Sequence, residues 1–276
     1  MKLKISYILS ILITTSIWAG QEELNVVKEK WIKWADSMVT SERDMFLKNY
    51  GLDSSCLNNN EIIELFKSNS DKKAKQEVDS SQKNRFYKIV GKIKNLLFSP
   101  SEDLKISEEN SKAVKQIATE ILKKYNNIEI LNNPKFEIGD VGVFRHYKNN
   151  ICYIILNCDM HLKNISQLKE ILLHEYSHII YEDNINEEII QYAAWSNSNA
   201  EREEIEKQTL SYHRAFEARA DVYAAINSPD HGKYLIDFTK TLPENSEIFT
   251  HPKKSDRIAL LEKIKFELDS ANEKKD

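Results

Sequence analysis

Residues His174, Glu175 and His178 have the types and the spacing of a metal-dependent hydrolytic site. They lie in segment 171–181, which reads ILLHEYSHIIY and contains the pattern H-E-x-x-H. On a helix, residues i and i+4 share one face, so both imidazoles can meet one metal ion. Glu175 projects about 100° further round the helix and can reach a water molecule on the open side of that ion. We therefore expect the two histidines to bind zinc and Glu175 to act as a general base.

A zinc site needs at least one further protein ligand, and segment 216–225 offers two acidic residues at helical spacing. It reads FEARADVYAA, with Glu217 and, one turn later, Asp221. Glu217 resembles the third ligand of a gluzincin, in which a Glu on a following helix completes a His2Glu set. Spacing alone leaves this role open, because the region contains many Glu. Asp221 is placed to accept a hydrogen bond from the outer nitrogen of a ligating His.

Three blocks of the sequence, in order, resemble the HtpX and CAAX-prenyl-protease superfamily of zinc metallopeptidases (peptidase family M forty-eight). The first is H-E-x-x-H. The second, Glu217-x-x-Ala220-Asp221, is similar to the E-x-x-A-D motif of that superfamily. The third, Thr250-His251-Pro252 followed by Arg257-Ile258, is similar to its T-H-P-x-x-x-x-R-[IV] segment. The blocks span roughly residues 165–266, and residues 20–130 match nothing in the family.

The resemblance implies a zinc metalloendopeptidase with one Zn²⁺ per chain, bound by His174, His178 and Glu217. It implies that His251 helps to stabilise the oxyanion of the tetrahedral intermediate, with Glu175 as the base. Arg257 would pair with an acid near the site. Because no transmembrane helix or tetratricopeptide array follows the catalytic motifs, the chain looks like the soluble, exported members. Its partner would be a protein or peptide substrate in the cell envelope or outside the cell.

Two alternative functions remain open at this point. One is an exported metal-binding protein without proteolytic activity, in which the helical N-terminal region binds a partner as a chaperone would. The other is an amidase or another zinc hydrolase, which would share the zinc ligands but not the two later motifs. A complete set that includes Glu175 argues against an inactive relative.

The elements that must position these residues are mostly helices. Gly and Pro number 6 and 5, far below the roughly 12% of an average chain, which favours a mainly α (α+β) fold. The resemblance specifies a gluzincin-type catalytic unit with a small β-hairpin or sheet and an H-E-x-x-H helix, preceded by a helical region. Apolar periodicity predicts helices over 22–50, 107–125, 165–182, 187–195, 199–226, 231–241 and 254–271.

A β-hairpin is predicted from 136–147 and 151–156, separated by the turn Lys148-Asn149-Asn150. The second strand, ICYIIL, is a candidate edge at which an extended substrate adds as another strand. On that hypothesis, Ile151, Tyr153 and Ile155 bind substrate.

The sequence predicts a signal peptide over 1–19, a helical N-terminal region over 20–130 and a catalytic domain over 131–276. Lys2 and Lys4 precede an apolar run from Ile5 to Trp18, which is typical of a secretory leader. The expected location is the bacterial periplasm or the medium, and an uncleaved N-terminal anchor is the alternative. We expect no membrane span in the mature chain. The net charge of −4 argues against nucleic acid as a partner.

The remaining cysteines and histidines give weaker expectations. In an oxidising compartment Cys56 can pair with Cys152 or Cys158, or all three can be buried thiols. His213 shares the helix face of Glu217, but a packed or surface role is the more common one for such a residue. His231 follows Pro229-Asp230 in a turn and is expected to be exposed.

Overall fold

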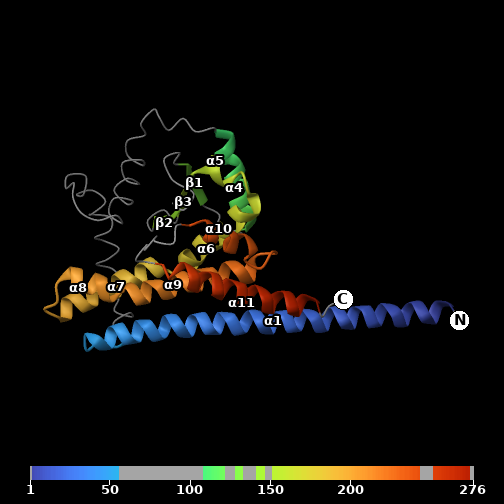
Figure 1. Cartoon of the computed structure of the whole chain (residues 1–276), viewed down its shortest axis with the longest axis horizontal. Coiled ribbons are helices and arrows are strands. Elements are labelled where there is room, and N and C mark those ends of the chain that lie inside the picture. Colours follow the sequence, from blue (N-terminus) through green and yellow to red (C-terminus); the bar gives the residue numbers. More distant parts are fainter. Residues whose placement is uncertain are drawn as a thin grey trace. The chain divides into compact units, whose positions relative to one another are not determined.

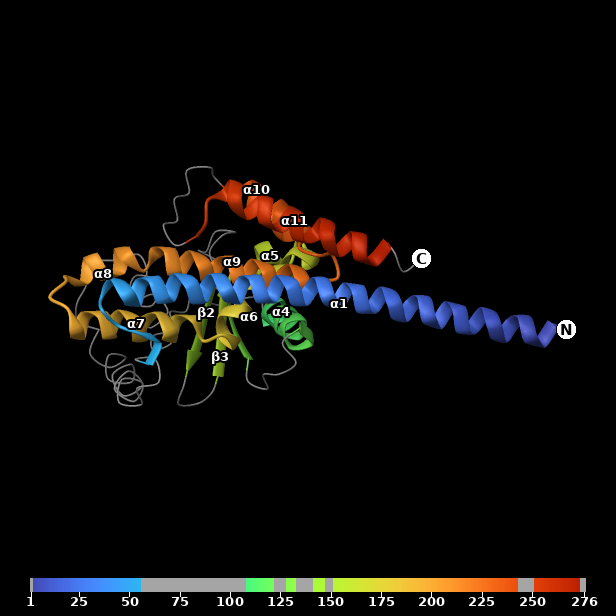
Figure 2. The ribbon, with the colours of Figure 1, turned by 90° about the horizontal axis from the view of Figure 1, so that it is seen from below.

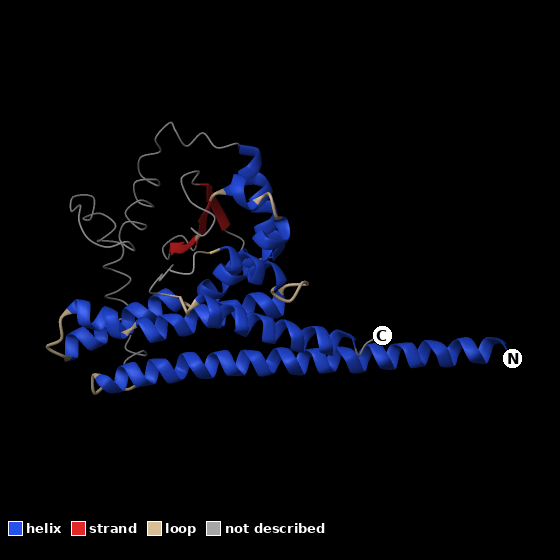
Figure 3. Cartoon of the chain, in the orientation of Figure 1, coloured by secondary structure: helices blue, strands red, loops and turns tan. Residues whose placement is uncertain are grey.

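The structure is a computed structural model that describes residues 2–55, 108–121, 128–132, 141–146, 151–242 and 251–273. In this part of the chain the fold is mainly helical, as predicted, with one small sheet (Figure 1; Figure 3). The helices are α1 (Lys2–Asn49), α4 (Glu108–Ile121), α5 (Cys158–His161), α6 (Ile165–Ile180), α7 (Asp183–Asn197), α8 (Arg202–Gln208), α9 (Leu210–Asn227), α10 (Lys233–Thr241) and α11 (Lys254–Glu273).

The chain divides into two compact units that do not follow the predicted boundary at residue 130. The first unit contains α1 as far as Phe46, together with α6, α9, α10 and α11. The second contains the sheet and helices α4, α5, α7 and α8. The sequence assigned α1 to a separate N-terminal region, whereas it belongs to the unit that carries the H-E-x-x-H helix.

The sheet of the second unit has three strands, β1 (Ile128–Asn132), β2 (Gly142–His146) and β3 (Ile151–Leu156). β2 and β3 pair antiparallel, as expected for the predicted hairpin, and β1 pairs parallel to β3 on its other side. The expectation that β3 is an edge strand is therefore wrong. Its backbone, including Ile151, Tyr153 and Ile155, is paired to β2, and from Cys152 onward it is also paired to β1, so no substrate strand can add there.

The core of the first unit is the contact between α6 and α9. α6 begins where the side chain of Asn164 accepts a hydrogen bond of 3.0 Å from the backbone N–H of Gln167, which caps the helix. Its buried face presents large aliphatic side chains to a face of α9 that is rich in buried alanines. Small side chains let two helix backbones approach closely. The buried alanines of α9 are Ala215, Ala218, Ala220, Ala224 and Ala225.

α1 lies beside other helices of its unit (Figure 2), and a stripe of its apolar side chains is buried. Trp31 is buried, and its indole N–H donates a hydrogen bond of 3.0 Å to Glu267 of α11. Arg219 of α9 lies 3.6 Å from Asp36 and stacks over the ring of Tyr181, at the end of α6. The described buried residues of the stripe are Leu24, Trp31, Ala35, Val39 and Phe46.

The predicted leader 1–19 lies at the start of α1, and its cleavage stays a prediction. Among the helices that the structure describes, none is both long enough and apolar enough to cross a membrane. The side chain of Cys158 in α5 is a buried thiol. Cys56, for which the sequence left the pairing open, lies outside the described residues.

Glu170 connects the H-E-x-x-H helix to the N-terminus of α10. Its buried carboxylate accepts hydrogen bonds from Ser228 Oγ at 2.5 Å and from the backbone N–H groups of Gly232 and Leu235 at 3.1 and 2.5 Å. Gly232 has a φ of 80°, which a glycine adopts without strain. Burial raises the pKa of Glu170, although all three donors oppose that shift. The carboxylate thus supplies the acceptors that the first turn of α10 otherwise lacks.

We predict that Glu170→Ala lowers the free energy of unfolding by about 1–3 kcal/mol, because it leaves buried N–H groups without an acceptor. Urea denaturation followed by circular dichroism measures this loss. The matched control is Glu262→Ala, which removes an exposed partner of Lys240 and should cost less than about 1 kcal/mol. Equal effects of the two substitutions would contradict the assigned role of Glu170.

Candidate metal centre

The two histidines of the H-E-x-x-H pattern lie one turn apart on α6 and face the same carboxylate of α9. Their ring centroids are 5.1 Å apart. The Nε2 atom of His174 lies 3.2 Å from Oε2 of Glu217, and the Nε2 atom of His178 lies 3.6 Å from Oε1 of the same residue. α6 and α9 therefore place both histidines within 3.6 Å of Glu217, but the group of possible metal ligands among the described residues is His174, Glu217 and His251 and does not include His178.

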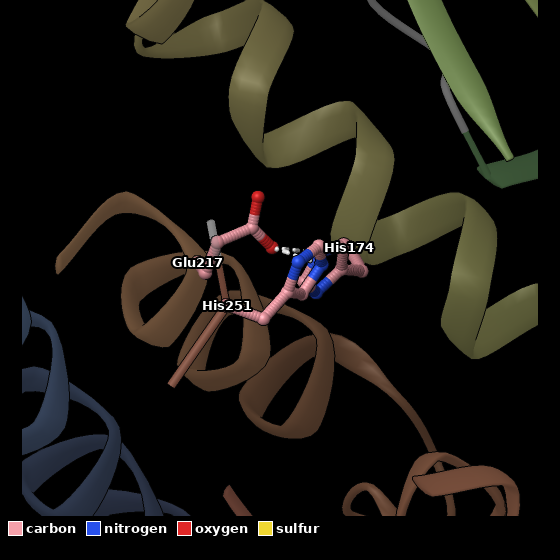
Figure 4. Close-up of side chains that lie close together, drawn as sticks. All are labelled: His174, Glu217 and His251. Atoms are coloured by element: carbon pink, nitrogen blue, oxygen red, sulfur yellow. Dashed lines mark hydrogen bonds and ion pairs between the residues drawn. The ribbon is translucent and has the colours of Figure 1, made fainter. Parts of the chain in front are cut away.

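His251, in the segment before α11, supplies a third imidazole to the same carboxylate (Figure 4). Its Nε2 atom lies 3.0 Å from Oε2 of Glu217. One potential ligand atom from each of His174, Glu217 and His251 lies within 4.8 Å of the others. The side chain of His251 is 29% exposed, against 7% for His174 and 8% for Glu217, so it forms the most accessible side of this group.

The chemistry of these side chains is suited to a zinc ion. Four ligands at about 2.0–2.1 Å in tetrahedral geometry lie roughly 3.4 Å from one another. The separations between the imidazole nitrogens and the Glu217 oxygens, from 3.0 to 3.6 Å, are close to that value. Two or three neutral imidazoles with one carboxylate are also the donor chemistry that zinc prefers in catalytic sites.

The carboxylate of Glu217 is buried, and its ionised form depends on the surrounding imidazoles. Burial by itself would raise its pKa, but His251, His178, His174 and His213 together hold the pKa of Glu217 well below its usual range. A buried anion without such partners would cost several kcal/mol. The site is therefore arranged to keep a negative charge where a cation can bind.

Asp221 contacts His174 on the side away from Glu217, and Arg257 in turn contacts Asp221. Oδ1 of Asp221 lies 2.9 Å from Nδ1 of His174, the nitrogen that does not face Glu217. The two residues are in contact as predicted, but that nitrogen does not have the geometry of a hydrogen bond. Arg257 donates two hydrogen bonds to the same carboxylate, from Nε at 2.8 Å and from Nη2 at 2.7 Å. Against the effect of burial, Arg257 and His174 lower the pKa of Asp221 to about 2. The acid with which Arg257 was expected to pair is therefore Asp221.

Glu175, the expected general base, lies next to His174 on α6, and the surrounding charged groups affect its pKa. Burial raises its pKa, while His174, His178 and His251 act in the opposite direction and Glu217 adds to the rise. A carboxylate with a raised pKa binds a proton more readily than a solvated one, which suits a group that must accept a proton and later release it.

His213 is a site residue for which the sequence favoured a packed or surface role. It lies one turn before Glu217 on α9, and its Nε2 atom is 3.5 Å from Oε1 of that residue. The i,i+4 spacing was the available signal, but in a region with many charged residues it did not distinguish a site residue from a surface pair.

Two other expectations concern residues outside this group. His231 is not exposed: its side chain is 9% accessible, and Nδ1 lies 2.9 Å from Oδ1 of Asp269 on α11. That partner lies 38 residues further along the chain, so the local turn sequence could not indicate it. The proposed strand residues Ile151, Tyr153 and Ile155 belong to the other compact unit.

No family model, no curated protein and no solved structure matches this chain. The resemblance of the three sequence blocks to zinc metallopeptidases stays an expectation. The structure brings residues of all three blocks close together.

We predict that Arg257→Leu destabilises the protein by about 3–5 kcal/mol, because it leaves the Asp221 carboxylate buried without its charged partner. The double variant Asp221→Leu/Arg257→Leu should lose less than the sum of the two single variants. Guanidinium denaturation of all three variants measures this coupling. Arg202→Ala, which removes an exposed partner of Glu206, is the control and should cost less than about 0.5 kcal/mol. Additive single effects would show that the pair is not coupled.

Proposed function

We propose that this protein is a zinc-dependent endopeptidase that hydrolyses peptide bonds of proteins in the cell envelope or outside the cell. The observation that carries the proposal is the approach of both H-E-x-x-H imidazoles to the buried Glu217 carboxylate, with Glu175 beside them. The likeness of the three sequence blocks to zinc metallopeptidases supports the same reaction class, and the predicted leader supports export.

His174, His178 and Glu217 would hold one zinc ion. When bound, zinc would act as a Lewis acid and lower the pKa of a water molecule towards 7. The contact of Asp221 with Nδ1 of His174 leaves Nε2 of that ring directed at Glu217. Contacts of this kind fix the ring and the tautomer of a ligating histidine and raise its affinity for the metal.

Glu175 would act as the general base. Its carboxylate takes a proton from the attacking water as the oxygen of that water bonds to the scissile carbonyl carbon. The same proton then goes to the amine nitrogen as the C–N bond breaks, which restores the carboxylate. The raised pKa of Glu175 supports both halves of this transfer.

His251 has two candidate roles, because its Nε2 atom lies as close to Glu217 as the α6 histidines do. Its higher exposure favours a position on the substrate side, where an N–H group can donate to the oxyanion. We therefore assign it to the oxyanion and not to the metal.

We predict that Glu175→Gln lowers kcat/KM for casein by about 10²–10⁴-fold, because the amide cannot accept the proton, while bound zinc stays near one per chain. Elemental analysis and a cleavage assay of the purified wild type and variant test this. Removing zinc with 1,10-phenanthroline should abolish cleavage, and adding zinc back should restore it.

A wild type that binds zinc but cleaves nothing would instead favour the exported, non-proteolytic metal-binding protein. A wild type without stoichiometric zinc would remove the basis of both proposals.

We predict that His251→Ala lowers kcat by about 10²–10³-fold, the effect of removing one oxyanion donor, and leaves the zinc content unchanged. His178→Ala, made in parallel, should lose the metal, because it removes a ligand. Zinc analysis together with steady-state kinetics separates the two roles. Loss of zinc from His251→Ala with retention in His178→Ala would reassign the metal to His174, Glu217 and His251.

A further inference from the structure

The Glu217 carboxylate contacts four imidazoles, and the proposed reaction uses only three of them. Its Oε2 atom faces His174 and His251 at 3.2 and 3.0 Å. Its Oε1 atom faces His178 and His213 at 3.6 and 3.5 Å. His213 is not part of the H-E-x-x-H pattern or of the T-H-P segment, so no role has been assigned to it.

His213 differs from the other three imidazoles because it lies on the same helix as the carboxylate. On one helix face, residues i and i+4 lie about 5–6 Å apart at Cβ whatever the neighbouring helices do. The backbone spacing that lets His213 meet Glu217 is therefore set by α9 alone. The contacts of Glu217 with His174 and His178 depend in addition on how α6 packs against α9.

The His213 ring is held in place from its own helix. Its centroid lies 5.8 Å from the ring of Phe216, which in turn contacts Tyr212 with a centroid distance of 4.3 Å. The side chain of His213 is only 16% exposed. A ring with few accessible rotamers loses little entropy when it fixes the long Glu217 side chain, which has more rotatable bonds.

We propose that His213 is a positioning residue that holds Oε1 of Glu217 and so orients this carboxylate towards the metal. The inference rests on the proposed zinc site. With Nε2 protonated, the neutral ring donates to Oε1 and acts through Glu217 without binding the ion. Groups that hydrogen-bond a metal-ligating side chain commonly change metal affinity by 10–100-fold when they are removed.

The test compares His213→Ala, His213→Gln and the control Ser211→Ala, which changes a partly exposed side chain two residues away on α9. Each full chain is stripped of metal and titrated with Zn²⁺ against a competing chelator dye. We expect His213→Ala to bind zinc about 10–100-fold more weakly. His213→Gln, whose amide can donate to the carboxylate from the same position, should recover most of this loss, and Ser211→Ala should match the wild type.

Two further measurements separate positioning from folding. The melting temperature of the metal-free form should be the same for His213→Ala and for Ser211→Ala. The visible absorption spectrum of the Co²⁺-loaded form should change in His213→Ala and return towards that of the wild type in His213→Gln, because it reports how the ligands are arranged.

Zinc affinity of His213→Ala within twofold of the wild type would overturn the inference, as would equal weakening in His213→Ala and His213→Gln. These outcomes leave the proposed function intact, because the wild type still binds zinc. A wild type that binds no zinc would remove the proposed function and this inference together.

Discussion

Two buried carboxylates one turn apart on α9, Glu217 and Asp221, constrain how the other helices of the first unit pack. A carboxylate removed from water must be paired, because the desolvation of an unpaired ion costs several kcal/mol. Asp221 is paired by Arg257 in a two-point contact and by His174. Glu217 is surrounded by imidazoles from α6, from α9 itself and from the segment before α11. The partners of these two side chains therefore fix the arrangement of three helices.

Asp221 and Glu217 have partners of different kinds. Asp221 has a permanent cation, because a guanidinium keeps its proton at any working pH. The partners of Glu217 are imidazoles, which can exchange a proton for a metal ion. Asp221 and Arg257 consequently form a fixed structural pair. Glu217 is instead a carboxylate whose charge a divalent cation can balance. His174 contacts both Asp221 and Glu217, so the position of the Asp221–Arg257 pair affects the position of Glu217.

The supporting contacts lie away from the site and fix the helices that carry it. Glu170, one turn before His174 on α6, holds the first turn of α10. Trp31 and Glu267 connect α1 to α11, and Arg219 of α9 extends towards Asp36 of α1. α1 is thus part of the site-bearing unit, although nothing in its own sequence indicates which helices it contacts.

The sequence by itself determined most of the elements and indicated which residues could do chemistry. Helical periodicity located α6 and α11 to within two residues, and H-E-x-x-H placed two imidazoles on one face, because both properties depend only on local spacing. The single helix predicted over 199–226 is divided into α8 and α9. The β-branched run ICYIIL located β3 for the same reason, while β2 covers only Gly142–His146 of the strand predicted over 136–147.

Only the tertiary structure decided which distant side chains meet. It joined Arg257 to Asp221, brought His231 to Asp269 and made β3 a central strand by adding β1 to its open side. These outcomes depend on packing between segments tens of residues apart, where burial makes an unpaired charge or an unpaired backbone group costly. Short-range sequence patterns contain no information about that free-energy cost. They could therefore name the residues able to do chemistry but not their partners.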